Sequence, residues 1–155
     1  MLRIDLPGQP SLELHHLVLD FNGTLALRGA VVAGVAERLN RLTDQLELHC
    51  VTGDTFGTAK AALEGLPVSL HVLPPTGQSN AKRAFITGLE GGVCAIGNGW
   101  NDRLMLAEAE LGLAVLMHEG AAGATLMAAR AVFPSILDAL DALLLPGRMV
   151  AVLRD

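Results

Sequence analysis

The sequence has few aromatic residues and no excess of positive charge. Only 3% of its 155 residues are aromatic, none is tyrosine, and the formal net charge is -5 at pH 7. Proteins that bind nucleic acids normally present a basic face, and those that bind single strands also stack bases on aromatic rings. The composition therefore predicts no nucleic-acid partner.

Cysteine is scarce as well, with Cys50 and Cys94 the two present. Each lies within an apolar stretch that predicts a buried strand, and neither belongs to the CxxC or Cys/His spacings of zinc sites. Buried cysteines pack as small hydrophobic groups. Both are therefore expected to be reduced thiols in the core.

Long uninterrupted apolar runs are also missing. The most apolar stretch, 111–133, contains His118, Glu119 and Arg130, which argues against a membrane span. The amino-terminal segment carries Asp5 early and lacks the apolar core of a signal peptide. These features predict a cytoplasmic protein that does not contact membranes.

Hydrophobic residues, in contrast, make up 51% of the chain, and they recur in short strand-like runs that alternate with segments of helical periodicity. Strands are expected at 1–6, 12–14, 14–21, 46–51, 68–73, 93–97, 113–117 and 131–133. Helices are expected at 31–46, 55–66, 79–89, 102–109, 121–129 and 135–145, the last one closing the chain.

The inner strands are apolar on both faces, which is typical of parallel strands covered by helices on both sides. The sequence therefore predicts an α/β fold in which residues 1–155 form a single domain. Its architecture is expected to be a three-layer α/β/α, Rossmann-like arrangement with a mainly parallel central sheet.

Two oxygen-rich motifs follow predicted strands and turn through glycine: DFNGTL at 20–25 and GNGWND at 97–102. In open α/β sheets, ligands bind at the carboxyl ends of the strands. Carboxylate and amide oxygens at that edge suit Mg²⁺ and a phosphoryl group. Thr52 and Gly53 end another strand in the same way, and Lys82 lies early on a helix.

Each of these residues also has a purely structural interpretation. Asp20 precedes turn-forming residues and could cap that turn. Thr52 could cap the following helix, although Asp54 is the better candidate for that role. A lone lysine such as Lys82 is usually solvated. Taken singly, these residues leave both interpretations open.

Taken together, an acid, a hydroxyl, a lysine and an acidic loop in this order are what an aspartyl-phosphate enzyme needs. The first aspartate attacks phosphorus and becomes an acyl phosphate. The hydroxyl and the lysine neutralise the transferring oxygens, and the acidic loop holds Mg²⁺.

On these motifs the chain resembles the haloacid dehalogenase (HAD) superfamily of Mg²⁺-dependent phosphohydrolases, whose four motifs run D-x-D-G-T, S/T, K and G-D-x-x-N-D. The match covers 14–106 in that order. More narrowly, the chain is similar to small soluble proteins that carry the catalytic core of P-type ATPases without the membrane part.

The resemblance implies a role for each matching residue. It makes Asp20 the nucleophile and adds Thr52, Lys82 and Asp102 to the catalytic set. It implies phosphate binding by Thr52, Gly53, Lys82 and Asn22. Mg²⁺ would be held by Asp20, Asn22 through its backbone carbonyl, Asn98 and Asp102, with Asn101 and Asp102 orienting the lysine and the waters of the metal.

Two positions depart from the family pattern. Asn22 stands where most of these phosphatases have an aspartate that protonates the leaving group and then activates water, and a carboxamide cannot do that work. Losing such a group commonly costs about 10²–10⁴-fold in rate. Asn98 stands where the family has an aspartate metal ligand, so weaker Mg²⁺ binding is expected.

The spacing of the motifs leaves no room for the cap domain of many relatives. Segment 24–31 can hold only a turn, and segment 52–82 only one helix and one strand before the lysine helix. The site is therefore expected to be open, and capless relatives tend to act on large phosphorylated substrates or to form homo-oligomers.

Other polar and aromatic residues are assigned structural roles. His15, His16, His49 and His71 are expected to be ordinary strand residues without a partner acid. Segment 118–120 ends its strand near the predicted site and is expected to be a turn, the alternative being that it lines the cleft. The ring of Trp100 is expected to pack over its loop, the alternative being contact with a substrate or partner.

The sequence thus predicts a slow Mg²⁺-dependent phosphohydrolase that acts through phospho-Asp20. Two alternatives stay open. Loss of acids at positions 22 and 98 also fits a regulatory or non-catalytic module that binds Mg²⁺ and phosphate. In a subunit whose role is assembly, the site residues would be scaffold only.

Overall fold

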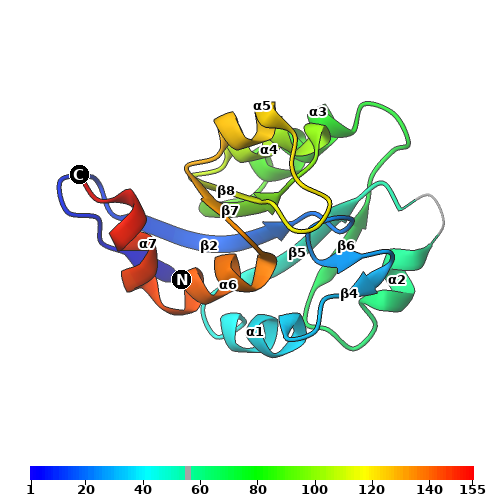
Figure 1. The fold of residues 1–155 in the computed structure, drawn as a ribbon, viewed down its shortest axis with the longest axis horizontal. Helices are drawn as coiled ribbons and strands as arrows, with labels where there is room; N and C mark the ends of the chain where they lie inside the picture. Colours follow the sequence, from blue (N-terminus) through cyan, green and yellow to red (C-terminus); the bar gives the residue numbers. More distant parts are fainter. Residues whose placement is uncertain (55–56) are drawn as a thin grey trace.

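The computed structural model describes residues 1–54 and 57–155, and its centre is a seven-stranded sheet (Figure 1). The strands of this sheet are β1 (Leu2–Ile4), β2 (Leu12–Leu19), β5 (Glu47–Thr52), β6 (Ser69–Val72), β7 (Gly92–Gly97), β8 (Leu111–Val115) and β9 (Ala131–Phe133). Their order is β6-β5-β2-β7-β8-β9, with β1 beside the start of β2. The β1–β2 pair is antiparallel and the other pairs of this sheet are parallel.

Helices cover both faces of the sheet (Figure 1). One face packs against α1 (Val35–Leu42), α2 (Thr58–Ala62), α6 (Ile136–Leu144) and α7 (Pro146–Leu153). The other packs against α3 (Gln78–Thr87), α4 (Arg103–Glu108) and α5 (Gly123–Ala128). The predicted three-layer α/β/α fold is confirmed. No helix in the described residues has the length and apolarity needed to span a membrane.

Most predicted elements are present, but three details of the prediction are wrong. The expected strands 12–14 and 14–21 form one continuous strand, β2. The segment after Thr24 is a small hairpin, β3 (Ala26–Leu27) and β4 (Ala30–Val31), rather than a bare turn. A further helix, α7, follows the helix expected to close the chain. Pro146 does not prevent it, because proline is tolerated in the first turn of a helix.

Helix boundaries differ from the prediction by a few residues. The helix expected at 31–46 begins at Val35, after Gly34 with φ of 89°. The start of the helix expected at 55–66 falls on residues 55–56, which lie outside the described residues, and α2 begins at Thr58 with Gly57 before it. Both predicted core cysteines, Cys50 and Cys94, are buried and unpaired, as expected.

A β-bulge in β2 changes which face of the sheet each side chain occupies. The register with β7 shifts between Leu14 and His16, so that His15 is the extra residue. Before the bulge Leu14 faces the α1/α6 core, and after it Leu17 does so. An extra residue in a strand reverses the alternation of side chains beyond it. His16 therefore lies on the same face as Val18, toward α3.

We expect two glycine substitutions to have opposite effects on stability. A Cβ on Gly112 in β8 would overlap the backbone carbonyl of Leu106 in α4, whereas a Cβ on Gly147 in α7 meets nothing within 4 Å. Gly112→Ala should lower the free energy of unfolding by about 1–3 kcal/mol. Gly147→Ala should raise it by about 0.4–1 kcal/mol by reducing the freedom of the unfolded chain. Urea unfolding measures both, and equal midpoints would contradict the packing described for β8 and α4.

Candidate active site

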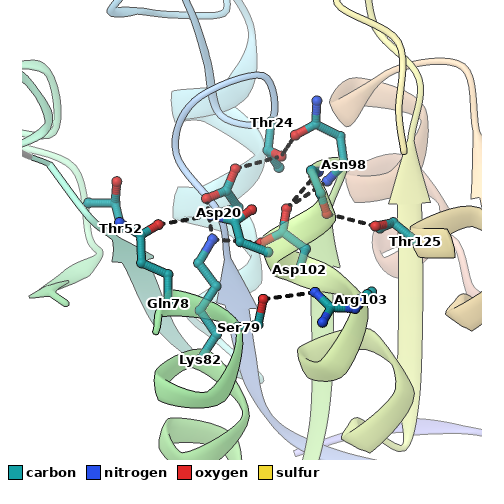
Figure 2. Close-up of polar contacts among 12 residues, drawn as sticks. Asp20, Thr24, Thr52, Gln78, Ser79, Lys82, Asn98, Asp102, Arg103 and Thr125 are labelled. Atoms are coloured by element: carbon teal, nitrogen blue, oxygen red, sulfur yellow. Dashed lines mark hydrogen bonds and ion pairs between the residues drawn. The ribbon is translucent and has the colours of Figure 1, made fainter. Parts of the chain in front are cut away.

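The motif residues gather at the carboxyl ends of three adjacent strands. Asp20 directly follows β2, Thr52 ends β5, and segment 98–102 follows β7. Because β2 lies between β5 and β7, Asp20 occupies the centre of this edge. Lys82 reaches it from α3 (Figure 2).

The amino group of Lys82 lies between two carboxylates (Figure 2). Its Nζ donates to Oδ1 of Asp20 and to Oδ1 of Asp102, each at 2.6 Å. The side chains of Lys82 and Asp102 are 0% exposed and that of Asp20 is 9% exposed. Two buried carboxylates around one ammonium leave a net negative charge, which favours the approach of a cation to Asp20.

Burial and mutual charge set the ionisation of this triad. Burial, followed by the charge of Asp102, raises the pKa of Asp20 to about 6, against the opposing effect of Lys82. For Lys82 burial opposes the charged form, but the charges of Asp20 and Asp102 outweigh it and raise its pKa. The cationic form of Lys82 is therefore favoured, whereas the raised pKa of Asp20 makes the charge of this carboxyl depend on pH around 6.

The second oxygen of Asp102 holds the β7 loop in place. Its Oδ2 accepts hydrogen bonds from the backbone N–H of Asn98 at 3.0 Å and of Gly99 at 2.9 Å. The carbonyl of Gly99 accepts from Oγ1 of Thr125 at 2.7 Å. Both oxygens of Asp102 are thus engaged by the protein itself, so a contact with a metal would run through a bound water.

The side chain of Asn98 is oriented by its neighbours. Its Nδ2 donates to the carbonyl of Gly120 at 3.1 Å. Since a carbonyl only accepts, the amide oxygen must point the other way, toward the hydroxyl of Thr24, which lies 3.4 Å from Asn98 Oδ1 and 3.4 Å from Asp20 Oδ2. Two oxygens from different strands therefore converge near Thr24.

This donor set fits Mg²⁺. Carboxylate and amide oxygens are the ligands that hard cations prefer. Asp20 Oδ2 and Asn98 Oδ1 both face the hydroxyl of Thr24, whereas the ammonium of Lys82 faces the other Asp20 oxygen. The turn at 117–119 also brings in Glu119, since a Cβ on Gly23 would approach Asn98 Nδ2 and Glu119 Oε2 within 2.6 Å each. Glu119 can supply the negative charge that Asn98 lacks.

A cavity of about 630 Å³ opens in front of Asp20. The described residues that line it include Asn22, Thr52, Gly53, Asp54 and Asn98. Thr52 is 2% exposed and its Oγ1 accepts from the N–H of Asp54 at 3.3 Å, so its hydroxyl hydrogen can point at an anion in the cavity. Asn22 is exposed, and the Gly23 N–H that follows it donates to the carbonyl of Ala26 at 2.8 Å.

The cavity also contains residues that were not anticipated from the sequence, among them Gln78 and Arg28. Gln78 covers Gly53, where it would clash with any Cβ, and its Oε1 accepts from Nδ2 of Asn101 at 2.9 Å. Arg28 stands in the turn of the β3–β4 hairpin with φ of 53°. The signal for this hairpin is Arg28-Gly29 between short apolar runs, since such two-residue turns need positive φ at both positions.

Two expectations about single residues are wrong. Trp100 is 61% exposed rather than packed over its loop, and its ring contacts the guanidinium of Arg103, whose Cζ lies 4.1 Å from the ring centroid. His16, His49 and His71 do lie on strands, but His16 has an acid beside it: its Nδ1 is 3.5 Å from Oε2 of Glu47. Spacing along the sequence cannot show this contact because the residues lie on different strands.

No family model matches the sequence. An uncharacterized protein of Methanocaldococcus jannaschii is 46% identical over 63 residues, which are 41% of this chain and 68% of that protein.

Solved structures of HAD proteins share the fold. A HAD family hydrolase from Streptomyces avermitilis superposes with a TM-score of 0.67 at 19% identity, over 84% of each chain. The 3-deoxy-D-manno-octulosonate 8-phosphate phosphatase of Moraxella catarrhalis, solved with magnesium and phosphate ions, gives 0.71 at 14% identity over 90% of this chain and 92% of that chain. A zinc-transporting PIB-type ATPase gives 0.61 at 22% identity over 78% of this chain and 20% of the pump. The described residues therefore have the haloacid dehalogenase fold without a cap domain, and the chain belongs to one family with the M. jannaschii protein.

Proposed function

We propose that the protein is a slow Mg²⁺-dependent phosphohydrolase that forms a phosphoenzyme on Asp20. The observation that carries the proposal is the buried arrangement of Lys82 between Asp20 and Asp102, with Asp20 lining a cavity. A structural ion pair needs only one carboxylate and no cavity. The fold likeness to the phosphatases and the ATPase adds support.

In this proposal one oxygen of Asp20 binds the metal and the other attacks phosphorus. Oδ2 faces Thr24 and Asn98 and would hold Mg²⁺, which would neutralise charge on the phosphoryl group. Oδ1 then attacks phosphorus, the ester P–O bond breaks, and the new acyl phosphate lies next to the ammonium of Lys82. Thr52, through its hydroxyl, and Gly53 would bind the remaining phosphoryl oxygens, together with Asn22, which lines the same cavity.

The slow step follows from Asn22. A carboxamide neither protonates the leaving alkoxide nor takes a proton from the water that hydrolyses the acyl phosphate. Both proton transfers must then use solvent or another group of the cavity. The same residue favours a second candidate function, a regulatory module that stays phosphorylated on Asp20, and the lifetime of the phosphoenzyme separates the two.

The open cavity and Arg28 bear on the substrate. Arg28 is exposed and lines the same cavity as Asp20 and Thr52. A substrate with a phosphate ester and a second anionic group would use both Asp20 and Arg28. The M. catarrhalis relative in fold is a phosphatase of such a compound, a phosphorylated sugar acid. We propose phosphate monoesters that carry a further carboxylate or phosphate as the substrate class. We also propose that residues 1–155 act as a single domain and that the protein works in the cytoplasm.

The nucleophile is tested by Asp20→Asn, which keeps the size of the side chain and removes its charge. We expect Mg²⁺-dependent phosphate release from such monoesters to disappear in this variant, because an amide does not attack phosphorus. Asp5→Asn, at an exposed ion pair with Arg3 far from the cavity, is the control and should keep the parent rate. Residual release that is equal in Asp20→Asn and in the parent would exclude phospho-Asp20 catalysis.

Asn22→Asp should restore the missing acid and raise kcat by about 10²–10⁴-fold. Asn98→Asp is the matched comparison, since it adds the same charge to the metal site and not to the position of the acid. We expect it to lower the Mg²⁺ concentration needed for half-maximal rate while changing kcat less than Asn22→Asp does. Steady-state kinetics over a Mg²⁺ titration would show both effects, and an unchanged kcat in Asn22→Asp would refute the assignment of the slow step.

The pH dependence follows from the raised pKa of Asp20. Asp20 attacks only as a carboxylate, so kcat/KM should fall as the pH drops through about 6 when Mg²⁺ is scarce. A bound cation favours the carboxylate, so saturating Mg²⁺ should move this acid limb to lower pH. Profiles of kcat/KM at low and high Mg²⁺ measure the shift. An acid limb that stays in place at every Mg²⁺ concentration would mean that another group controls it.

A further inference from the structure

A row of three histidines crosses the sheet on the face toward α3. His16 on β2, His49 on β5 and His71 on β6 form two successive contacts. His16 Nδ1 lies 3.2 Å from His49 Nε2, and His49 Nδ1 lies 3.3 Å from His71 Nε2. The ring of Phe85 packs against His49 and His71 with centroid distances of 5.5 and 4.5 Å. The proposed phosphohydrolase uses none of these residues.

The β-bulge of β2 is what brings His16 into this row. The extra residue, His15, shifts the alternation so that His16 follows Val18 onto the α3 face, where His49 lies beside Val51. In an unbulged strand His16 would share the face of Leu14 and point into the other core. Bulges often re-aim a side chain at a functional position.

The hydrogen-bond partners of His16 show that its Nδ1 offers a lone pair to the neighbouring side chains. Its Nε2 lies 3.1 Å from the carbonyl oxygen of Glu90, which only accepts, so Nε2 carries the hydrogen. In the neutral ring Nδ1 then carries no hydrogen and can act as an acceptor or a metal ligand. This nitrogen faces both His49 Nε2 at 3.2 Å and the carboxylate of Glu47 at 3.5 Å. Three donor atoms therefore surround one point, all within 4.8 Å of one another.

We propose that His16, Glu47 and His49 bind a divalent transition-metal ion of the Zn²⁺ type. Two nitrogens bound to tetrahedral zinc at about 2.0–2.1 Å lie roughly 3.3 Å apart, close to the 3.2 Å between His16 Nδ1 and His49 Nε2. Two imidazoles and one carboxylate suit Zn²⁺, Co²⁺ or Ni²⁺, whereas Mg²⁺ prefers oxygen ligands.

The remaining ring nitrogens are arranged as outer partners of such a site. With the lone pair of His49 Nε2 on the metal, the hydrogen of this ring moves to Nδ1, which then donates to His71 Nε2 at 3.3 Å. His16 already donates to Glu90 through Nε2. Metal-binding histidines characteristically donate their second N–H to such a partner, which fixes the ring.

The surroundings allow a cation to enter. His16 and His49 are 8% and 9% exposed, but the side chain of Glu47 is 76% exposed. A hollow of about 520 Å³ leads to His16, and its described lining includes the acidic residues Asp44, Glu47 and Glu90. The rings are thus held in place by packing, while the carboxylate can close over an ion from the solvent side.

This site is separate from the proposed Mg²⁺ site and does not depend on the proposed activity. Glu47 begins β5, whereas Thr52 ends it at the edge that carries Asp20. Along β2, His16 lies four residues before Asp20, which corresponds to about 13 Å of strand. The two sites therefore take different cations at different depths of the same sheet.

The test is direct metal binding to the full chain, without phosphate or substrate. Isothermal titration with Zn²⁺ and the visible absorption of the Co²⁺ complex should show one site that millimolar Mg²⁺ does not displace. The same site should persist in Asp20→Asn, so failure of the phosphohydrolase proposal leaves this result unaffected.

Variants assign the ligands. We expect His49→Gln to weaken Zn²⁺ binding by more than about 100-fold and His71→Gln, an outer partner, by about 10–100-fold. Glu47→Gln is exposed and should fold normally, yet it should weaken binding and change the Co²⁺ spectrum. His118→Gln and Glu64→Gln, exposed elsewhere, are the controls and should bind as the parent does. Parent-like binding in Glu47→Gln and His49→Gln, or loss of binding only in Asp20→Asn, would overturn the proposal and leave the histidines as a hydrogen-bonded row.

Discussion

The ion pairs of one buried lysine determine how the catalytic edge of this fold is assembled. Lys82 is fully enclosed, so its charge is tolerable only because Asp20 and Asp102 both lie 2.6 Å away. These two carboxylates come from the ends of β2 and β7, and the lysine comes from α3. Each of the three elements is therefore fixed relative to the others by one group, and the loop after β7 is fixed in turn through the second oxygen of Asp102.

The same helix organises the neighbouring regions of the molecule. Gln78, in the first turn of α3, covers Gly53 at the end of β5 and bonds Asn101 of the β7 loop. Phe85, one turn after Lys82, packs on two of the histidines. Since residues three apart lie on one side of a helix, α3 presents Lys82 and Phe85 to the sheet together. The position of one helix thus links the carboxyl edge of the sheet to the histidine row.

The layered fold could be predicted because it follows from patterns between residues that are close together in the sequence. Strands apolar on both faces alternate with helices, and glycine-containing turns mark where each strand ends. Asp20, Thr52, Asn98 and Asp102 could be singled out because they end or follow predicted strands, and strand-end positions in a parallel sheet converge. Lys82 lies on α3 and could be singled out only by its place in the order of the motifs. Features that depend on pairing between distant strands could not be predicted.

The bulge at His15 is the clearest example of such a feature. It is defined by the register of β2 against β7, about 77 residues away along the chain, and no local pattern reveals it. If the bulge is not taken into account, the alternation of side chains in β2 places His16 on the face of Leu14 instead of the face toward α3. The contact of His16 with Glu47 then cannot be predicted. The turn expected at 118–120 is present at 117–119, but the approach of Glu119 to Asn98 depends on how this loop folds back onto the sheet. The exposure of Trp100 could not be predicted for the same reason.

The hydrogen bonds of the two loop glycines also bear on how the protein ages. Asn22-Gly23 and Asn98-Gly99 are the dipeptides most prone to deamidation, a reaction in which the glycine nitrogen attacks the asparagine side chain and closes a five-membered imide. Here the Gly23 N–H is held by the carbonyl of Ala26 and the Gly99 N–H by Asp102. Each bond keeps that nitrogen turned away from the preceding amide. The folded state thereby slows the deamidation of Asn22 and Asn98. Each of these asparagines loses that protection when its own loop opens.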